Sequence, residues 1–85
     1  MNCSVFSVIK YHYTTPHYSP DHCHPFYELN FYFSGNGYTE ILEERFDFTK
    51  MGFAIIPPNA PHNEQFSSAG IVLCILFEAD ALPFE

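Results

Sequence analysis

The residues with the clearest chemical potential in this chain of 85 residues are His22, His24 and Glu28, which lie in one short stretch. If that stretch is extended, side chains of the same parity point to one face of the strand. A second stretch runs from Gly52 through a proline-rich turn and ends at His62, which would add a third imidazole from a neighbouring strand. Imidazole nitrogens and a carboxylate oxygen together suit Zn, Fe, Mn or Ni. We therefore predict a site for a divalent transition metal formed by His22, His24, Glu28 and His62.

Further polar side chains continue the same alternation. Asn30 and Tyr32 follow Glu28, and Glu64 follows His62. Amide and hydroxyl groups on such a face would hydrogen-bond a sugar or a small acid, and aromatic rings would stack on a sugar. The pattern predicts a cavity whose ligand contacts are His24, Glu28, Asn30, Tyr32, His62 and Glu64. A polar cavity without metal is the alternative for the same residues.

These side chains need a framework, and the pattern around them predicts strands. Short β-rich segments recur every eight to twelve residues or so with turn residues between them, whereas no long window has a helical period. The expected strands span residues 5–13, 26–33, 37–43, 46–48, 53–56, 62–66 and 71–77. Residues 14–21, with Pro16 and Pro20, are expected to form a loop, and Gly35 a turn. Residues 78–85 are expected to begin a helix, and the fold class to be all-β.

Charge excludes one class of function for this chain. Ten acidic residues face only Lys10, Arg45 and Lys50, and the formal charge is -7. A nucleic-acid surface needs clustered cations, so we expect no direct nucleic-acid binding.

Cysteines and hydropathy bear on the compartment. Cys3, Cys23 and Cys74 have no framework spacing, which suits a reducing cytosol. Cys23 lies between two predicted ligands but on the opposite face, so we expect it to pack rather than to bind metal. The N-terminus has no signal-peptide pattern, and the longest apolar run, residues 71–77, is too short to span a bilayer. We expect a cytoplasmic protein that does not contact membrane.

The spacing of these residues resembles a known pattern. His-x-His-x3-Glu-x6-Gly, the first motif of the cupin superfamily, is matched at His22, His24, Glu28 and Gly35. The second cupin motif is matched more loosely at Gly52, Pro57 and His62, with one residue fewer between the glycine and the proline. Asn59 stands where that motif has its middle glycine, and Phe66 where it has an asparagine.

The local sequence resembles one branch of that superfamily over about residues 20–78. His-x-His-Pro-Phe-Tyr-Glu-Leu, Ser-Gly-x-Gly and Gly-Phe-Ala-Ile-Ile-Pro-Pro-Asn-x-Pro-His are similar to the N-terminal ligand-sensing domain of AraC-type transcription regulators, the arabinose-binding and dimerisation type. The resemblance implies a small cupin double-stranded β-helix, or jelly-roll barrel. It implies that residues 1–85 are one domain, truncated at the C-terminus, whose DNA-binding domain is missing. The implied function is effector sensing, and the alternative is a stand-alone metal-dependent cupin enzyme of the dioxygenase or isomerase type.

The opposite face of the 26–33 strand carries a row of large apolar groups, namely Tyr27, Leu29, Phe31 and Phe33. Such a row is large for the bare surface of a monomer. AraC-type sensors resemble this chain in using their N-terminal region to dimerise, so we expect a homodimer or a covering segment.

Overall fold

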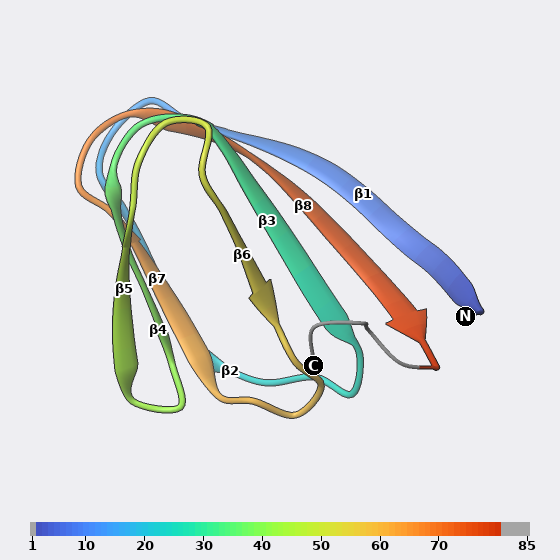
Figure 1. Ribbon diagram of the computed structural model, residues 1–85. Coiled ribbons are helices and arrows are strands. Elements are labelled where there is room, and N and C mark those ends of the chain that lie inside the picture. The colour runs from blue at the N-terminus through green and yellow to red at the C-terminus, as the bar shows by residue number, and fades with distance from the viewer. Residues whose placement is uncertain (1, 81–85) are drawn as a thin grey trace.

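The computed structural model describes residues 2–80, and within that range it contains eight strands and no helix (Figure 1). The strands are β1 (Cys3–Tyr13), β2 (His17–His22), β3 (Tyr27–Ser34), β4 (Gly37–Ile41), β5 (Glu44–Phe48), β6 (Phe53–Ile56), β7 (His62–Phe66) and β8 (Gly70–Ala79).

The strands form two antiparallel sheets of four strands each. The first sheet has the order β1-β8-β3-β6, and the second has the order β2-β7-β4-β5. Figure 1 shows them as two layers, with the long strands β1, β8 and β3 side by side in one. Apart from β4 and β5, which pair within the second sheet, consecutive strands alternate between sheets, as in a jelly roll. The all-β prediction and the jelly-roll barrel are confirmed.

The core lies between the sheets and is built from aromatic rings. Tyr32 and Phe66 are fully buried, and Phe48 and Val72 are nearly so. The ring of Tyr32 stacks on that of Phe48 with centroids 3.8 Å apart. Large rings bury much apolar area per residue, which suits a barrel of this size.

Alternation along β3 positions the site. Glu28, Asn30 and Tyr32 are buried on the inner face of the first sheet, with exposed fractions of 9%, 3% and 0%. On β7 the inner face carries His62, Glu64 and Phe66, which are buried or half-buried. The inward-facing side chains predicted for β3 and for β7 are therefore both present, and the two sets face each other across the barrel.

Three local expectations differ from the structure. Residues 17–22 form the edge strand β2 instead of a loop, because an edge strand tolerates Pro20 where its nitrogen need not donate. The β4–β5 turn lies at Leu42 and Glu43, both with positive φ, one or two residues earlier than expected. Strand β8 continues to Ala79, so no helix begins at residue 78, and residues 81–85 of that expected helix lie outside the described residues.

The outer face of the first sheet is apolar. Tyr27 is covered, because its ring stacks on Phe77 with centroids 5.1 Å apart. Leu29 and Phe31 are half-buried, and Phe33 is 40% exposed. With Phe53 and Ile55 of β6, Leu29 and Phe31 line a shallow apolar hollow of about 420 Å³.

Two further findings concern glycine and membranes. The predicted turn at Gly35 is present, and Gly35 has a positive φ of 93°, whereas Gly52 has no such backbone angle. In the described part of the chain, no helix could cross a membrane.

Candidate functional site

The four predicted metal ligands come together from four different segments. His22 ends β2, His24 lies in the loop that follows, Glu28 lies in β3, and His62 begins β7 beside His22. One donor atom from each of the four lies within 4.8 Å of the others. Glu28 and His62 are buried, His24 is half-buried and His22 is exposed, so the cluster is open on one side.

Each histidine is oriented by its own backbone. Nδ1 of His22 lies 2.9 Å from the carbonyl oxygen of Pro20, Nδ1 of His24 lies 3.0 Å from that of Phe26, and Nδ1 of His62 lies 2.8 Å from that of Ala60. A carbonyl only accepts hydrogen bonds, so each Nδ1 carries a proton and donates it. Such bonds to Nδ1 fix the ring and leave Nε2 as the ligand atom, the usual arrangement around metal-binding histidines.

Glu28 lies opposite these ring nitrogens. Its Oε1 is 3.0 Å from Nε2 of His24 and 3.5 Å from Nε2 of His62, and its Oε2 accepts a hydrogen bond of 2.7 Å from Nδ2 of Asn30. Burial disfavours its charged form, but the contacts with His62, Asn30 and His24 outweigh burial and lower the pKa of Glu28 to about 2. The carboxylate is therefore ionised and faces the cluster.

His62 has the least satisfied nitrogen of the cluster. Burial opposes its protonation, yet the nearby Glu28 carboxylate outweighs burial and raises the pKa of His62. Its Nε2 is buried and has no hydrogen-bond partner. A buried polar atom without a partner is costly, so binding a proton or a cation at this nitrogen would be favourable.

A second carboxylate lies deeper in the barrel. Oε2 of Glu64 accepts a hydrogen bond of 2.7 Å from the hydroxyl of Tyr32, and longer bonds of 3.4 Å from Thr39 and Asn30. Burial is the largest cause that raises the pKa of Glu64, against the opposing effect of the Tyr32 hydroxyl. Asn30 thus bridges the two carboxylates.

A hollow of about 260 Å³ adjoins the cluster and contains part of the predicted ligand set. Glu28, Asn30 and Glu64 line it, whereas His24 and His62 belong to the cluster at its side. Tyr32 lies behind the wall, where its hydroxyl holds Glu64 and does not reach the hollow. His22 of the cluster also lines it. The rest of the lining consists of residues that the sequence analysis did not select: Tyr11, Tyr13, His17, Ser19, Val72 and Cys74.

The alternation of side chains along β1 and β8 is a sequence signal that could have identified some of these lining residues. Tyr11 and Tyr13 share one parity on β1, and Val72 and Cys74 share one parity on β8. His17 stacks on Tyr13 with centroids 4.2 Å apart, and isolated histidines carry no such signal in the sequence. Burial raises the pKa of Tyr13 to about 12 and that of Cys74 to about 12, so both stay neutral. Cys23 is exposed and takes no part in the cluster, so the expectation that it packs was wrong.

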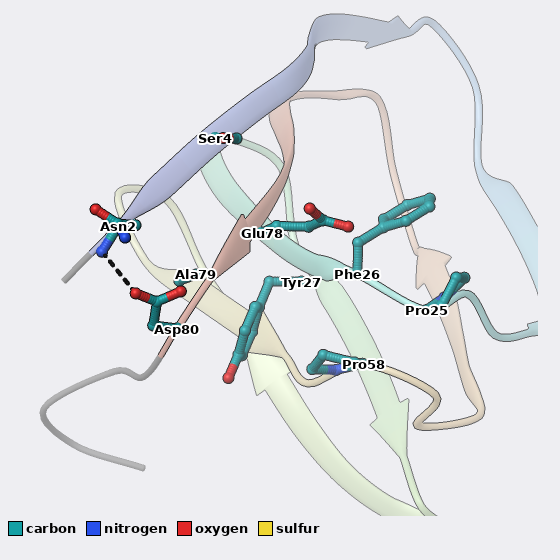
Figure 2. A pocket seen from close by; sticks show the side chains of 9 residues that line it. All are labelled: Asn2, Ser4, Pro25, Phe26, Tyr27, Pro58, Glu78, Ala79 and Asp80. Atoms are coloured by element: carbon teal, nitrogen blue, oxygen red, sulfur yellow. Dashed lines mark hydrogen bonds between the residues drawn. The ribbon is translucent and has the colours of Figure 1, made fainter.

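Another hollow, of about 330 Å³, lies at the far end of the long strands (Figure 2). Phe26, Tyr27 and Pro58 contribute to its wall together with Glu78 of β8. Phe26 is half-buried there, and its ring also stacks on that of His24 with centroids 4.4 Å apart. None of the metal-cluster residues lines this second hollow.

Comparison with known proteins supports the fold. The profile of the AraC-like ligand binding domain matches residues 4–83, nearly the whole chain. The chain belongs to this family. A search of curated proteins gives no match to this AraC-like domain.

Several of the solved structures that are similar to this AraC-like domain are named as cupins. An RmlC-like cupin from Shewanella frigidimarina superposes with a TM-score of 0.79 at 13% identity, over 92% of this chain and 76% of that one. A cupin superfamily protein from Desulfitobacterium hafniense gives 0.78 at 8% identity, over 92% and 77%. A cupin protein from Bacteroides fragilis gives 0.71 at 21% identity, over 96% and 70%. At these identities the likeness establishes the cupin fold and nothing further.

Proposed function

We propose that this AraC-like domain senses a small molecule for a transcription regulator, with a divalent transition metal at the cluster of His22, His24, Glu28 and His62. The effector would bind in the adjoining hollow, where Asn30 and Glu64 offer polar contacts. Family membership supports small-molecule binding. The scarcity of cations, Lys10, Arg45 and Lys50 alone, supports DNA contact through a separate domain of the regulator.

The observation that carries the metal proposal is the orientation of the rings. Because Nδ1 of His24 and His62 is the protonated nitrogen, Nε2 of each neutral ring holds a lone pair. Both lone pairs face Oε1 of an ionised Glu28 at 3.0 Å and 3.5 Å. Lone pairs and a carboxylate repel one another unless a cation lies among them. At low pH, a bound proton would relieve this repulsion. At neutral pH, a metal ion bound by all four ligands would relieve it.

The metal would also explain how an acidic pocket holds an acidic effector. Glu28 and Glu64 are the ionisable carboxyls of the hollow, and no Lys or Arg is among its lining residues. A small acid would be repelled by these carboxylates, whereas a divalent ion would accept a carboxylate or hydroxyl oxygen as a further ligand. A sugar needs no such help, because Asn30 and the carboxylates would accept or donate its hydroxyl hydrogen bonds. Metal would thus decide between the two effector classes.

A titration with Zn²⁺ or Ni²⁺ tests the site. The purified chain should show saturable binding by calorimetry, and a His24→Ala, His62→Ala double variant should lose it. His12→Ala is the matched control, since His12 is exposed on β1 and lies outside the cluster. Equal binding by the double variant and the parent chain would refute the assignment of ligands.

A metal-dependent cupin enzyme is the second candidate, and Glu64 is the observation that favours it. Its carboxyl lines the hollow and has a raised pKa, so it would hold a proton more readily than an ordinary carboxyl. A screen of sugars and small carboxylates by thermal shift, with and without metal, would find molecules that bind the folded chain. Mass spectrometry of the recovered molecule then separates the two candidates. A sensor returns it unchanged, and an enzyme converts it.

A further inference from the structure

A third hollow, of about 370 Å³, lies beside the β4–β5 turn on the second sheet. Alternation along β7 places Asn63 on the opposite face of the strand from His62 and Glu64, so this hollow is separate from the interior of the barrel. Its lining is acidic, with one amide and two apolar residues: Asp21, Glu40, Leu42, Glu43, Pro61 and Asn63. It contains no Lys or Arg and no member of the predicted metal cluster.

The amide of Asn63 bridges two carboxylates across three strands. Strand β7 lies between β2 and β4, and Asn63 pairs with Glu40 of β4. Nδ2 of Asn63 donates to Oδ1 of Asp21 at 2.7 Å and to Oε1 of Glu40 at 2.9 Å. These two bonds fix the orientation of the amide, because a flipped amide would turn its oxygen toward two oxygens that only accept hydrogen bonds.

The oxygen of the same amide has no partner. Asn63 is only 6% exposed, and its Oδ1 is buried without a hydrogen bond from any of the described residues. A buried acceptor without a donor is unfavourable and is rare in folded proteins. The ionised carboxylates around it are acceptors as well. The hollow therefore lacks a hydrogen-bond donor, and its negative charge favours a donor that is a cation.

A metal ion does not fit these acceptors. In the part of the chain that the structure describes, one group of three or more His, Cys, Asp or Glu side chains converges closely enough for a metal, and it contains none of the carboxylates of this hollow. A guanidinium reaches further, because it is planar and presents five N–H donors in a fixed fork. Glu40 already has such a neighbour on its other side, where Oε2 lies 3.6 Å from Nη2 of Arg45.

Leu42 and Pro61 form an apolar side of the hollow. Leu42 has a φ of 51°, a left-handed angle that leucine rarely adopts and that asparagine or glycine adopts more easily. Its side chain is 63% exposed, and its N–H donates to the carbonyl oxygen of Pro61 at 3.0 Å. Neither the core nor the turn thus explains a leucine at this position. An aliphatic stem, like that of arginine, would pack on such a surface while its charged end reached the carboxylates.

We infer that this hollow binds a guanidinium group carried on an aliphatic stem. The guanidinium donates to Oδ1 of Asn63 and to the carboxylates of Asp21 and Glu43. The stem packs on Leu42 and Pro61. A small guanidino compound or an arginine side chain of a polypeptide supplies this chemistry, and the net charge of -7 attracts either one. The inference goes beyond the proposed function and depends on neither the metal nor the effector.

An NMR titration of the ¹⁵N-labelled 85-residue chain with butylguanidinium tests the site. We expect saturable shifts of the side-chain amide of Asn63 and of the backbone amides of Leu42 and Glu43, with weaker binding at high salt. The backbone signals of Glu28 and Asn30, in the barrel, should not move. Butylammonium, which has the same stem and a compact charge, should bind more weakly. A capped Gly-Arg-Gly peptide distinguishes the two sources, since tighter binding than butylguanidinium indicates a polypeptide and weaker binding a small compound.

Isosteric variants test the assigned contacts. Asp21→Asn combined with Glu43→Gln removes two charges at constant size, and the dissociation constant of butylguanidinium should rise about tenfold, since each exposed ion pair contributes only a few-fold. Glu44→Gln is the matched control, because Glu44 is an exposed carboxylate next in the sequence but outside the lining, and it should leave the dissociation constant unchanged. The inference is overturned if the Asn63 amide does not shift, if Glu44→Gln weakens binding as much as the double variant, or if Ca²⁺ moves these signals and butylguanidinium does not.

Discussion

The hydroxyl of Tyr32 supports the buried carboxylate of Glu64, and its removal has a predictable cost. Tyr32 is fully buried, and its hydroxyl donates to Oε2 of Glu64 at 2.7 Å and lies 3.0 Å from Oγ1 of Thr39. In Tyr32→Phe the ring keeps its stacking on Phe48, so the change isolates the polar contact. Glu64 then retains only the two long bonds from Thr39 and Asn30, each 3.4 Å.

The size of the effect follows from the charge on Glu64. A hydrogen bond to an ionised group contributes about 1.5–3 kcal/mol, and a buried group left unsatisfied costs a similar amount. We expect Tyr32→Phe to lower the free energy of unfolding by about 2 kcal/mol at alkaline pH. For a domain of this size that is roughly an 8–16 °C lower melting temperature.

The effect should depend on pH, with a definite sign. The raised pKa of Glu64 means that the folded chain holds this proton more tightly than the unfolded chain. Its ionisation therefore costs stability as pH rises through the folded pKa. The Tyr32 hydroxyl opposes that rise in pKa, so the variant should lose more stability at pH about 8 than at pH about 4.5, where a carboxyl with a raised pKa carries its proton more often than an ordinary one.

Urea unfolding of four chains measures the contribution: the parent, Tyr32→Phe, Glu64→Gln and the double variant. The coupling energy between the two sites should be about 1–2 kcal/mol at alkaline pH and smaller in acid. Tyr38→Phe is the control, because that ring is half-buried under Arg45 and holds no carboxylate. A cost for Tyr32→Phe that is the same at both pH values, or the same with Gln at position 64, would contradict the reasoning.

Three other outcomes are expected. Gly35→Ala should lower the free energy of unfolding by about 2 kcal/mol in the urea assay, because its φ is 93° and a Cβ would lie 2.9 Å from the carbonyl oxygen of Ala69. Gly52→Ala is the comparison: the nearest atom to its Cβ would lie at 3.1 Å, and the variant should cost under about 1 kcal/mol in the same assay. Zn²⁺ should raise the melting temperature more at pH about 8 than at pH about 5.5, because the raised pKa of His62 lets protons compete with metal. Without metal, the pair of Glu28 and His62 should contribute most between pH about 4.5 and 6.5, since stability is lost in acid as Glu28 takes up a proton and in alkali as His62 loses one; a metal-free His62→Ala chain with an unchanged pH profile would contradict this.

The cluster of His22, His24, Glu28 and His62 shows how a correct prediction of which residues meet can rest on partly wrong geometry. Parity placed His22, His24 and Glu28 on one strand, whereas the structure distributes them over β2, a loop and β3. They meet because the chain crosses from the second sheet to the first between His22 and Tyr27, and each ring is turned by a carbonyl two residues away. The spacing of the first cupin motif includes the residues of this crossing. Alternation of side chains, in contrast, describes only residues within a single strand.

Tyr32 shows the opposite case. Its parity was read correctly, and it does lie on the inner face of β3. Whether an inward side chain reaches a cavity or fills the core depends on what faces it from the other sheet. Phe48 and Phe66 face Tyr32, so it became core, while Asn30 two residues earlier faces the hollow.

The sequence by itself determined the strands other than β2, the inward and outward faces of β3 and β7, and the identity of the four residues that cluster. These properties follow from the alternation of side chains, from turn residues and from motif spacing. Each of these signals lies within a short stretch of the sequence. Only the tertiary structure decided that β1 and β8 supply Tyr11, Tyr13, Val72 and Cys74 to the hollow, and that β1 is left as an open edge. The β1–β8 ladder joins residues 3–13 to residues 70–79, and such pairing depends on which distant strands bury the most surface together, which no local pattern records.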